Sequence, residues 1–181
     1  MWQGWADALN LPFDTLWSAL REDIAQGISH RHTIQRLSPG VDAMALRRAR
    51  LAGDAPIEAD LYPDVRPAFA ALRARGIRIG IAGNQPLEAA PALAALDLGA
   101  EFIATSAGWG VQKPAAEFFT RVADTCATPP EAITYVGDRV DNDVLPALAA
   151  GMRPAFIPRG LWAGIGQSPI PGIGSLTDLL G

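Results

Sequence analysis

The sequence has little of the residues that build disulfides and zinc sites. Its 181 residues include one cysteine, Cys126, and two histidines. A single cysteine forms neither a disulfide framework nor a cysteine-based zinc site within the chain. His30 and His32 have no third ligand near them in the sequence, which favours surface positions over a metal site. Cysteine and histidine chemistry is therefore not what this sequence predicts.

Long apolar runs and an excess of positive charge are also absent. No apolar run approaches the length of a membrane span. Residues 1–7 lack the cationic start and apolar core of a signal peptide. The formal net charge is −4, whereas nucleic acid or an anionic membrane as a partner would favour a basic face. We therefore expect a cytoplasmic protein that binds neither nucleic acid nor membrane.

Hydrophobic residues make up 49% of the chain, which is enough for a sizeable core. Residues 1–60 are helical in pattern and contain no convincing strand, and Leu16, Leu20 and Ile24 recur every four residues. Beyond residue 60, short apolar runs alternate with helical patterns, and strands are predicted at 77–82, 102–106, 133–136 and 153–158. This alternation predicts right-handed βαβ units and a Rossmann-like parallel sheet with helices on both faces. We expect an α/β core over residues 61–181 and a helical cap over residues 1–60.

The acidic segment after the predicted strand at 133–136 carries the first functional signal. Gly137 ends the strand, and Asp138, Asp141 and Asp143 follow within six positions. Crowded carboxylates at a buried strand tip cost free energy unless a cation joins them. Strand tips of parallel sheets are also where ligands bind, and hard cations prefer oxygen ligands. The segment favours a Mg²⁺ site; the alternative is a solvated turn in which Asp141 or Asp143 caps a helix.

Other polar residues are predicted at the same edge of the sheet. The strand tips bring together Asn84, Lys113, Asp138 and Asp143, which are far apart in sequence. A cation, an amide and paired acids in one crevice suit a phosphate with Mg²⁺. Lys113 precedes Pro114 and a predicted helix start, where anions are favoured; the alternative is an exposed loop lysine.

Four segments follow one another along the chain: Leu61-Tyr-Pro-Asp-Val, Ile79-Gly-Ile-Ala-Gly-Asn-Gln, Trp109-Gly-Val-Gln-Lys-Pro and Val136-Gly-Asp-Arg-Val-Asp-Asn-Asp. As an ordered set they resemble the phosphatase branch of the haloacid dehalogenase-like superfamily. The resemblance implies that Lys113 is the catalytic lysine of the third motif. It also implies that Asp138 and Asp143 hold Mg²⁺, with Asp141 a weaker candidate in the spacer. The implied activity is hydrolysis of a small phosphorylated metabolite through an aspartyl-phosphate.

The chain departs from the family pattern in two places. Gly83 occupies the position where a Ser or Thr normally binds the phosphoryl group, so the Gly83 N–H or the Asn84 amide is expected to replace it. The nucleophilic D-x-D motif at the tip of a first strand does not occur in the sequence. Asp14 has no apolar strand before it and no second acid, and is expected to be a helix N-cap. We therefore expect the central first strand to be missing, which would leave unpaired edges on the strands at 77–82 and 133–136.

The missing nucleophile leaves other functions open. One alternative is a non-catalytic binding module that keeps the crevice and uses the cap to hold a partner. Dehalogenation on the same fold is less favoured, because paired acids in the fourth motif suit a metal and a phosphate. On the cap, Trp17, His32 and Arg36 are candidates for contacts with a substrate.

Overall fold

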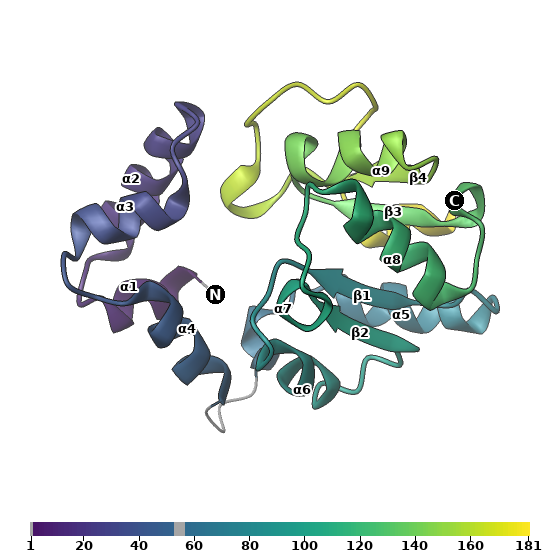
Figure 1. Ribbon diagram of the computed structural model, residues 1–181, viewed down its shortest axis with the longest axis horizontal. Coiled ribbons are helices and arrows are strands. Elements are labelled where there is room, and N and C mark those ends of the chain that lie inside the picture. Colours follow the sequence, from purple (N-terminus) through teal and green to yellow (C-terminus); the bar gives the residue numbers. More distant parts are fainter. Residues whose placement is uncertain (1, 53–56) are drawn as a thin grey trace.

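The computed structural model describes residues 2–52 and 57–181, and the first part of it is entirely helical. Its helices are α1 (Trp2–Ala8), α2 (Phe13–Ala25), α3 (His30–Leu37) and α4 (Ala43–Ala52). They gather on one side of the molecule, away from the strands (Figure 1). Ser29 caps α3, because its side chain accepts a hydrogen bond from the Arg31 N–H at 3.3 Å.

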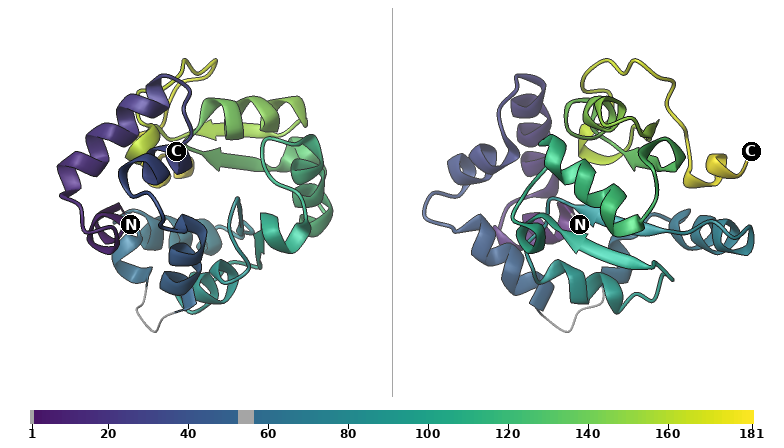
Figure 2. Two further views of the ribbon diagram at one scale, coloured as in Figure 1. Left: turned by 60° about the vertical axis from the view of Figure 1, so that its left-hand side comes forward. Right: turned by 45° about the vertical axis from the view of Figure 1, so that its right-hand side comes forward.

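One hydrophobic core holds these helices together. The four-residue spacing in α2 places its apolar side chains on a single face, and this core buries Leu16, Leu20 and Ile24 of α2 with Trp5 and Ile34. Leu161, which is only 1% exposed, belongs to the same core. It lies in the short 3₁₀ helix η4 (Gly160–Trp162), within a segment whose sequence suggests a surface loop. Arg21 of α2 donates hydrogen bonds to the Leu161 and Ala163 carbonyls, and the left view of Figure 2 shows this part of the chain next to the helices.

The α/β region follows the predicted alternation of helices and strands. Its α-helices and strands are α5 (Val65–Ala74), β1 (Gly80–Gly83), α6 (Ala89–Ala94), β2 (Phe102–Thr105), α7 (Ser106–Trp109), α8 (Ala116–Cys126), β3 (Thr134–Gly137), α9 (Leu145–Ala149) and β4 (Arg153–Phe156). Short turns complete it: 3₁₀ helices η1 (Ile57–Asp60), η2 (Pro130–Ala132) and η5 (Leu176–Leu180), and the π-helical turn η3 (Val140–Val144). The fold is of the mixed α/β type.

The four strands form two parallel pairs and not one continuous sheet. In the first pair Gly80 of β1 lies opposite Phe102 of β2, and in the second Thr134 of β3 lies opposite Arg153 of β4. Within the described residues, no strand pairing joins β1 to β3. The pairs nevertheless share their packing, because β1 and β3 contribute side chains to the same core clusters.

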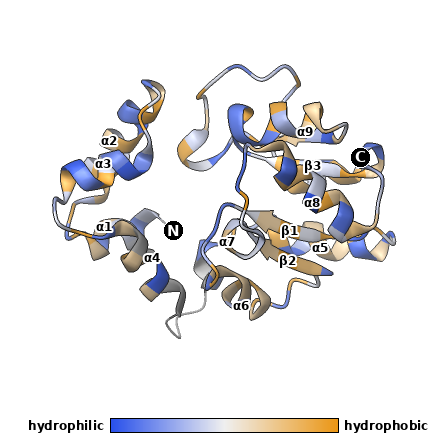
Figure 3. Cartoon of the chain, in the orientation of Figure 1, coloured by the Kyte–Doolittle hydropathy of each residue, from blue (hydrophilic) through white to orange (hydrophobic). Residues whose placement is uncertain are grey.

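Those clusters cover the two faces of the strands. On one face Ile81 and Val136 pack against the cluster that contains Leu96 and Ile157. On the other face Ala82 packs against the cluster that contains Tyr135 and the phenylalanines of α8. This alternation follows the period of two along a strand. Figure 3 shows hydrophobic residues concentrated on β1, β2 and α6. No helix in the described part of the chain is long and apolar enough to span a membrane.

Candidate functional site

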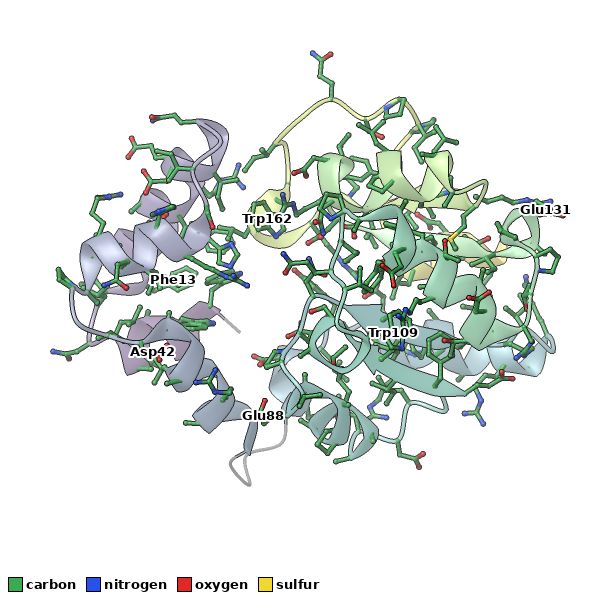
Figure 4. The ribbon with its side chains drawn as sticks, in the orientation of Figure 1. Phe13, Asp42, Glu88, Trp109, Glu131 and Trp162 are labelled. Atoms are coloured by element: carbon green, nitrogen blue, oxygen red, sulfur yellow. The ribbon has the colours of Figure 1, made fainter. Side chains whose placement is uncertain are left out.

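A cavity of about 1280 Å³ lies between the helical region and the tips of β1 and β3. All five site residues expected from the sequence line it: Gly83, Asn84, Lys113, Asp138 and Asp143. Figure 4 shows Trp162 and Glu88 on the side of the α/β region that faces helices α1–α4, and both line the same cavity. The strand tips therefore bring the predicted residues together.

Asp143 owes its position to the turn after β3. The chain passes from Gly137 into η3, whose Val140 and Val144 are buried and hold the turn in place. Asp143 folds back so closely that a Cβ on Gly137 would overlap its side chain. The Arg139 N–H donates to Asp143 Oδ2 at 3.1 Å. The result is a carboxylate that is only 3% exposed.

Lys113 meets this buried carboxylate directly. Its Nζ lies 2.5 Å from Asp143 Oδ1, and 5.9 and 5.7 Å from the ring centres of Phe118 and Tyr135. Burial lowers the pKa of Lys113, but Tyr135 and the Asp143 carboxylate outweigh this effect and hold the pKa above its usual value. Burial also raises the pKa of Tyr135 to about 12. Lys113 therefore remains a charged ammonium in this site.

Asp138 behaves differently from its neighbour. Burial, followed by the negative charge of Asp143, raises the pKa of Asp138 to about 6. A bound cation would reduce the electrostatic repulsion between these two neighbouring carboxylates. No group of three or more His, Cys, Asp or Glu residues arranged to hold a metal occurs among the described residues. The pair Asp138 and Asp143 still fits Mg²⁺, which is held by one or two carboxylates together with water and phosphate oxygens.

Asn84 is engaged with the backbone of Lys113. Its Oδ1 accepts a hydrogen bond from the Lys113 N–H at 2.8 Å, and its Nδ2 donates to the Lys113 carbonyl at 2.9 Å. This double contact links the tip of β1 to the lysine loop. Gly83, immediately before it, has open space at the position of a Cβ, where only the Gln85 side chain approaches, at 3.6 Å. A hydroxyl-bearing residue would thus fit at position 83.

Two other acids lie apart from this pair. The Asp141 side chain is 71% exposed and forms a two-point ion pair with Arg139. Asp14 is exposed and does not line the cavity. The expectation that Asp14 is a helix N-cap is wrong: α2 starts at Phe13 after Pro12 as N-cap, so Asp14 lies inside the first turn.

The sequence did not predict which residues of the helical region line the cavity. They include Trp2, His30, Arg31 and Arg48. Among the expected cap residues, Trp17 instead stacks on Phe13 with ring centres 5.5 Å apart, Arg36 pairs with Asp23 at 2.7 Å, and His32 lies outside the lining. The run Ser29-His-Arg-His marks a basic helix start, but it does not reveal which side chain faces the cavity.

Part of the sequence is similar to known phosphatases. The chain is 34% identical over 102 residues to a glyceraldehyde 3-phosphate phosphatase from Methanopyrus kandleri, and 36% identical over 94 residues to a phosphoglycolate phosphatase from Escherichia coli. These matches cover 55% and 50% of this chain, and 44% and 37% of those proteins. The chain thus matches less than half the length of these relatives.

A solved structure and a family comparison extend the similarity over more of the chain. The crystal structure of a HAD phosphatase from Thermococcus onnurineus shares the fold, with a TM-score of 0.59 and 22% identity, over 91% of this chain and 85% of that one. The family model of haloacid dehalogenase-like hydrolases matches residues 6–151. The chain therefore belongs to the haloacid dehalogenase-like hydrolase family.

Proposed function

We propose that this chain provides the phosphate- and magnesium-binding part of a phosphatase site for a small phosphorylated metabolite. The observation that carries the proposal is the buried contact of Lys113 Nζ with Asp143 Oδ1, beside Asp138, at the tips of two parallel strands. Few sites other than those for an anion and a cation would hold one ammonium and two carboxylates together, with one carboxylate buried and the other two groups half-buried. The phosphatase names of both curated relatives support this choice.

In this proposal each residue of the site has a separate role. Lys113 holds a phosphoryl oxygen as a compact charge, and Asn84 keeps the lysine loop in place. The Gly83 N–H binds a second phosphoryl oxygen. Asp138 and Asp143 would hold Mg²⁺, which when bound neutralises charge that develops on the phosphoryl oxygens.

The sequence has no nucleophilic D-x-D motif at the tip of a first strand. The proposal therefore assigns the nucleophile to an aspartate on a further strand, inserted between β1 and β3, that is not among the described elements. Glu88 and Asp141 are the other acids that line the cavity among the described residues. Asp141 is largely exposed and paired with Arg139, and Glu88 precedes α6 and does not follow a strand. The absence of pairing between β1 and β3 among those residues is compatible with an inserted parallel strand. Attack by its carboxylate on phosphorus would release the alcohol and form an aspartyl-phosphate, which water then hydrolyses.

Phosphoglycolate and glyceraldehyde 3-phosphate are the first substrates to test, given the names of the relatives. A helical cap over residues 1–60, an α/β core over residues 61–181 and a cytoplasmic location stay predictions. So does the expectation that nucleic acid and membranes are not partners.

The test is Mg²⁺-dependent binding of inorganic phosphate to the full chain, measured by calorimetry. Binding is expected for the wild type and should be lost in Lys113→Met and in Asp138→Asn. Asp141→Asn is the matched control, since Asp141 lies in the same turn but is largely exposed, and it should bind as the wild type does. Phosphate binding that is equal in all four proteins would overturn the proposal.

A non-catalytic binding module is the second candidate. The observation in its favour is that the acids lining the cavity, among the described residues, include none placed as a nucleophile. Hydrolysis of p-nitrophenyl phosphate by this chain with Mg²⁺, if it disappears in Asp138→Ala, would exclude the binding module. Phosphate binding without turnover is expected under both candidates, because the first assigns the nucleophile to a strand that is not among the described elements.

A further inference from the structure

The cavity wall opposite Asp138 and Asp143 is cationic. It carries Arg31, in the first turn of α3, and Arg48, on α4, and both side chains are exposed. Within the described residues, neither guanidinium forms an ion pair or a side-chain hydrogen bond. The other two cations of the cavity are occupied, since Lys113 contacts Asp143 and Arg139 contacts Asp141.

Stability of the fold does not explain these two arginines. A cation in the first turn of a helix faces the positive end of the helix dipole, so the position of Arg31 is unfavourable. The acids of the cavity outside the two ion pairs are Asp138 and Glu88, and neither lies within ion-pair distance of Arg31 or Arg48 among the described residues. Two guanidiniums without an acid partner that face one cavity are suited to an anion from outside the chain.

Aromatic rings border the same cavity and connect its two walls. His30 lies between Trp2 and Trp162 in edge-to-face contacts, with ring centres 6.2 and 5.8 Å away. Trp162 also supports the Arg139 guanidinium, which lies 4.3 Å from its ring centre. These rings offer apolar surface between the lysine side and the arginine side of the cavity. A ligand with a short carbon chain between two charged ends matches this arrangement.

We propose that the cavity takes a phosphate monoester whose far end carries a second anionic group, a carboxylate or a second phosphate, bound by Arg31 and Arg48. This inference rests on the proposed function, which puts the phosphoryl end of the ligand at Lys113. It adds a selection rule that the site around Lys113 and Asp138 cannot supply, because that site contacts only the phosphoryl group.

A series of ligands of equal length tests the inference. Propyl phosphate, 3-phosphonooxypropanoate and 1,3-propanediol bisphosphate are titrated into the full chain with Mg²⁺ by calorimetry, beside inorganic phosphate, and then the two- and four-carbon homologues. At least one of the two doubly anionic types should bind about tenfold or more tightly than the alkyl phosphate of the same length. Which type does so tells a carboxylate from a second phosphate.

Variants locate the second subsite. Arg31→Gln and Arg48→Gln should each reduce this preference several-fold, and together should abolish it, while affinity for propyl phosphate stays unchanged. Both side chains are exposed and without partners among the described residues, so the variants should fold. Arg36→Gln is the matched control on α3, because Arg36 pairs with Asp23 away from the cavity, and it should keep the preference.

The possible failures are distinguishable. Equal affinity for the neutral-ended and anionic-ended ligands at every length would overturn the inference and leave the proposed function standing. A preference that survives the double variant would also overturn it, because other residues would then bind the second group. Failure of inorganic phosphate and of every monoester to bind would overturn the proposed function, and this inference with it.

Discussion

At the scale of single residues, Asp138 carries a cost that a cation would remove. Its folded pKa of about 6 lies above the ordinary value near 3.8, so the folded state binds more protons than the unfolded state between these values. Asp138 therefore destabilises the metal-free fold as pH rises from about 4 to 6, and fully above pH 6. The cost at pH 8 is on the order of 1–3 kcal/mol.

Removal of the Asp138 charge should therefore stabilise the metal-free protein at high pH. Asp138→Asn should raise the stability of the metal-free protein at pH 8 by about 1–3 kcal/mol, with a gain that shrinks as pH falls from 6 toward 4. Urea denaturation at several pH values measures this. Asp141→Asn, at an exposed position, serves as the control and should change little. A gain that does not depend on pH would show that the charge is not its cause.

Position 83 allows a gain of function at the same scale. Gly83 lies where a Cβ meets only the Gln85 side chain, at an ordinary contact distance. Under the proposed function, Gly83→Ser adds a donor beside the phosphoryl group and should tighten Mg²⁺-dependent phosphate binding by roughly 3- to 10-fold. Gly83→Ala separates the hydroxyl from the added carbon and should give no gain. Equal effects of Ser and Ala in calorimetry would contradict the role of the hydroxyl.

At the scale of elements, Asp64 ties the end of the chain to the start of α5. It accepts hydrogen bonds from Arg159 Nη1, at 2.8 Å to each carboxylate oxygen, and from the Leu176 N–H of η5 at 2.8 Å. Burial raises the pKa of Asp64, but the Leu176 N–H, Arg159 and Ser175 together hold it below its usual value. The ionised carboxylate is thus part of the packing of η5 against α5.

Loss of this carboxylate should therefore weaken the fold. Asp64→Asn is expected to cost about 2 kcal/mol at pH 7, because hydrogen bonds to a charged, mostly buried group are lost. The folded pKa is depressed, so this contribution is present above pH 4 and disappears as pH falls below the usual aspartate value. Glu101→Gln breaks an exposed pair with Arg78 and should cost under about 1 kcal/mol. Similar costs for both variants in urea denaturation would refute the expectation.

The sequence predicts some elements better than others, for physical reasons. Strands came within a few residues of their predicted positions because short apolar runs have few alternative structures. Helix α7 was not predicted, and its first residue, Ser106, was expected to end a strand, although Thr105 caps the helix by accepting from the Gly108 N–H at 3.1 Å. Helix α9 begins at Leu145 with Val144 as its N-cap, so neither Asp141 nor Asp143 caps it, and the Asp143 carboxylate turns back to the Arg139 N–H.

The residues of the site were also predicted only in part. Convergence at parallel strand tips places Asn84, Lys113 and Asp143 in contact, and topology alone predicts this. The arginine and tryptophan wall depends on how the helices are rotated, which side-chain periodicity does not determine. Trp162 adds a contact from the far end of the sequence that no local pattern announces.

At the scale of the whole molecule, two strand pairs and a helical region surround one cavity, and its two walls carry different charges. The strand tips supply Asp138 and Asp143 with Lys113, and the helical wall supplies Arg31 and Arg48. Ligands that bridge the two walls should therefore stabilise the entire fold and not one part of it, by mass action.

The division between β1 and β3 also has a consequence for amide hydrogens. The carbonyls of Ile79 and Ile133 accept bonds from the β2 and β4 sides, so alternation along the strands turns the N–H groups of Gly80, Ala82, Thr134 and Val136 away from those partners. Hydrogen exchange followed by NMR should find these four amides faster than those of Ile81 and Tyr135. Uniform protection along both strands would contradict this pattern. A strand inserted between β1 and β3 would slow all four together, which makes them a direct reporter of sheet completion.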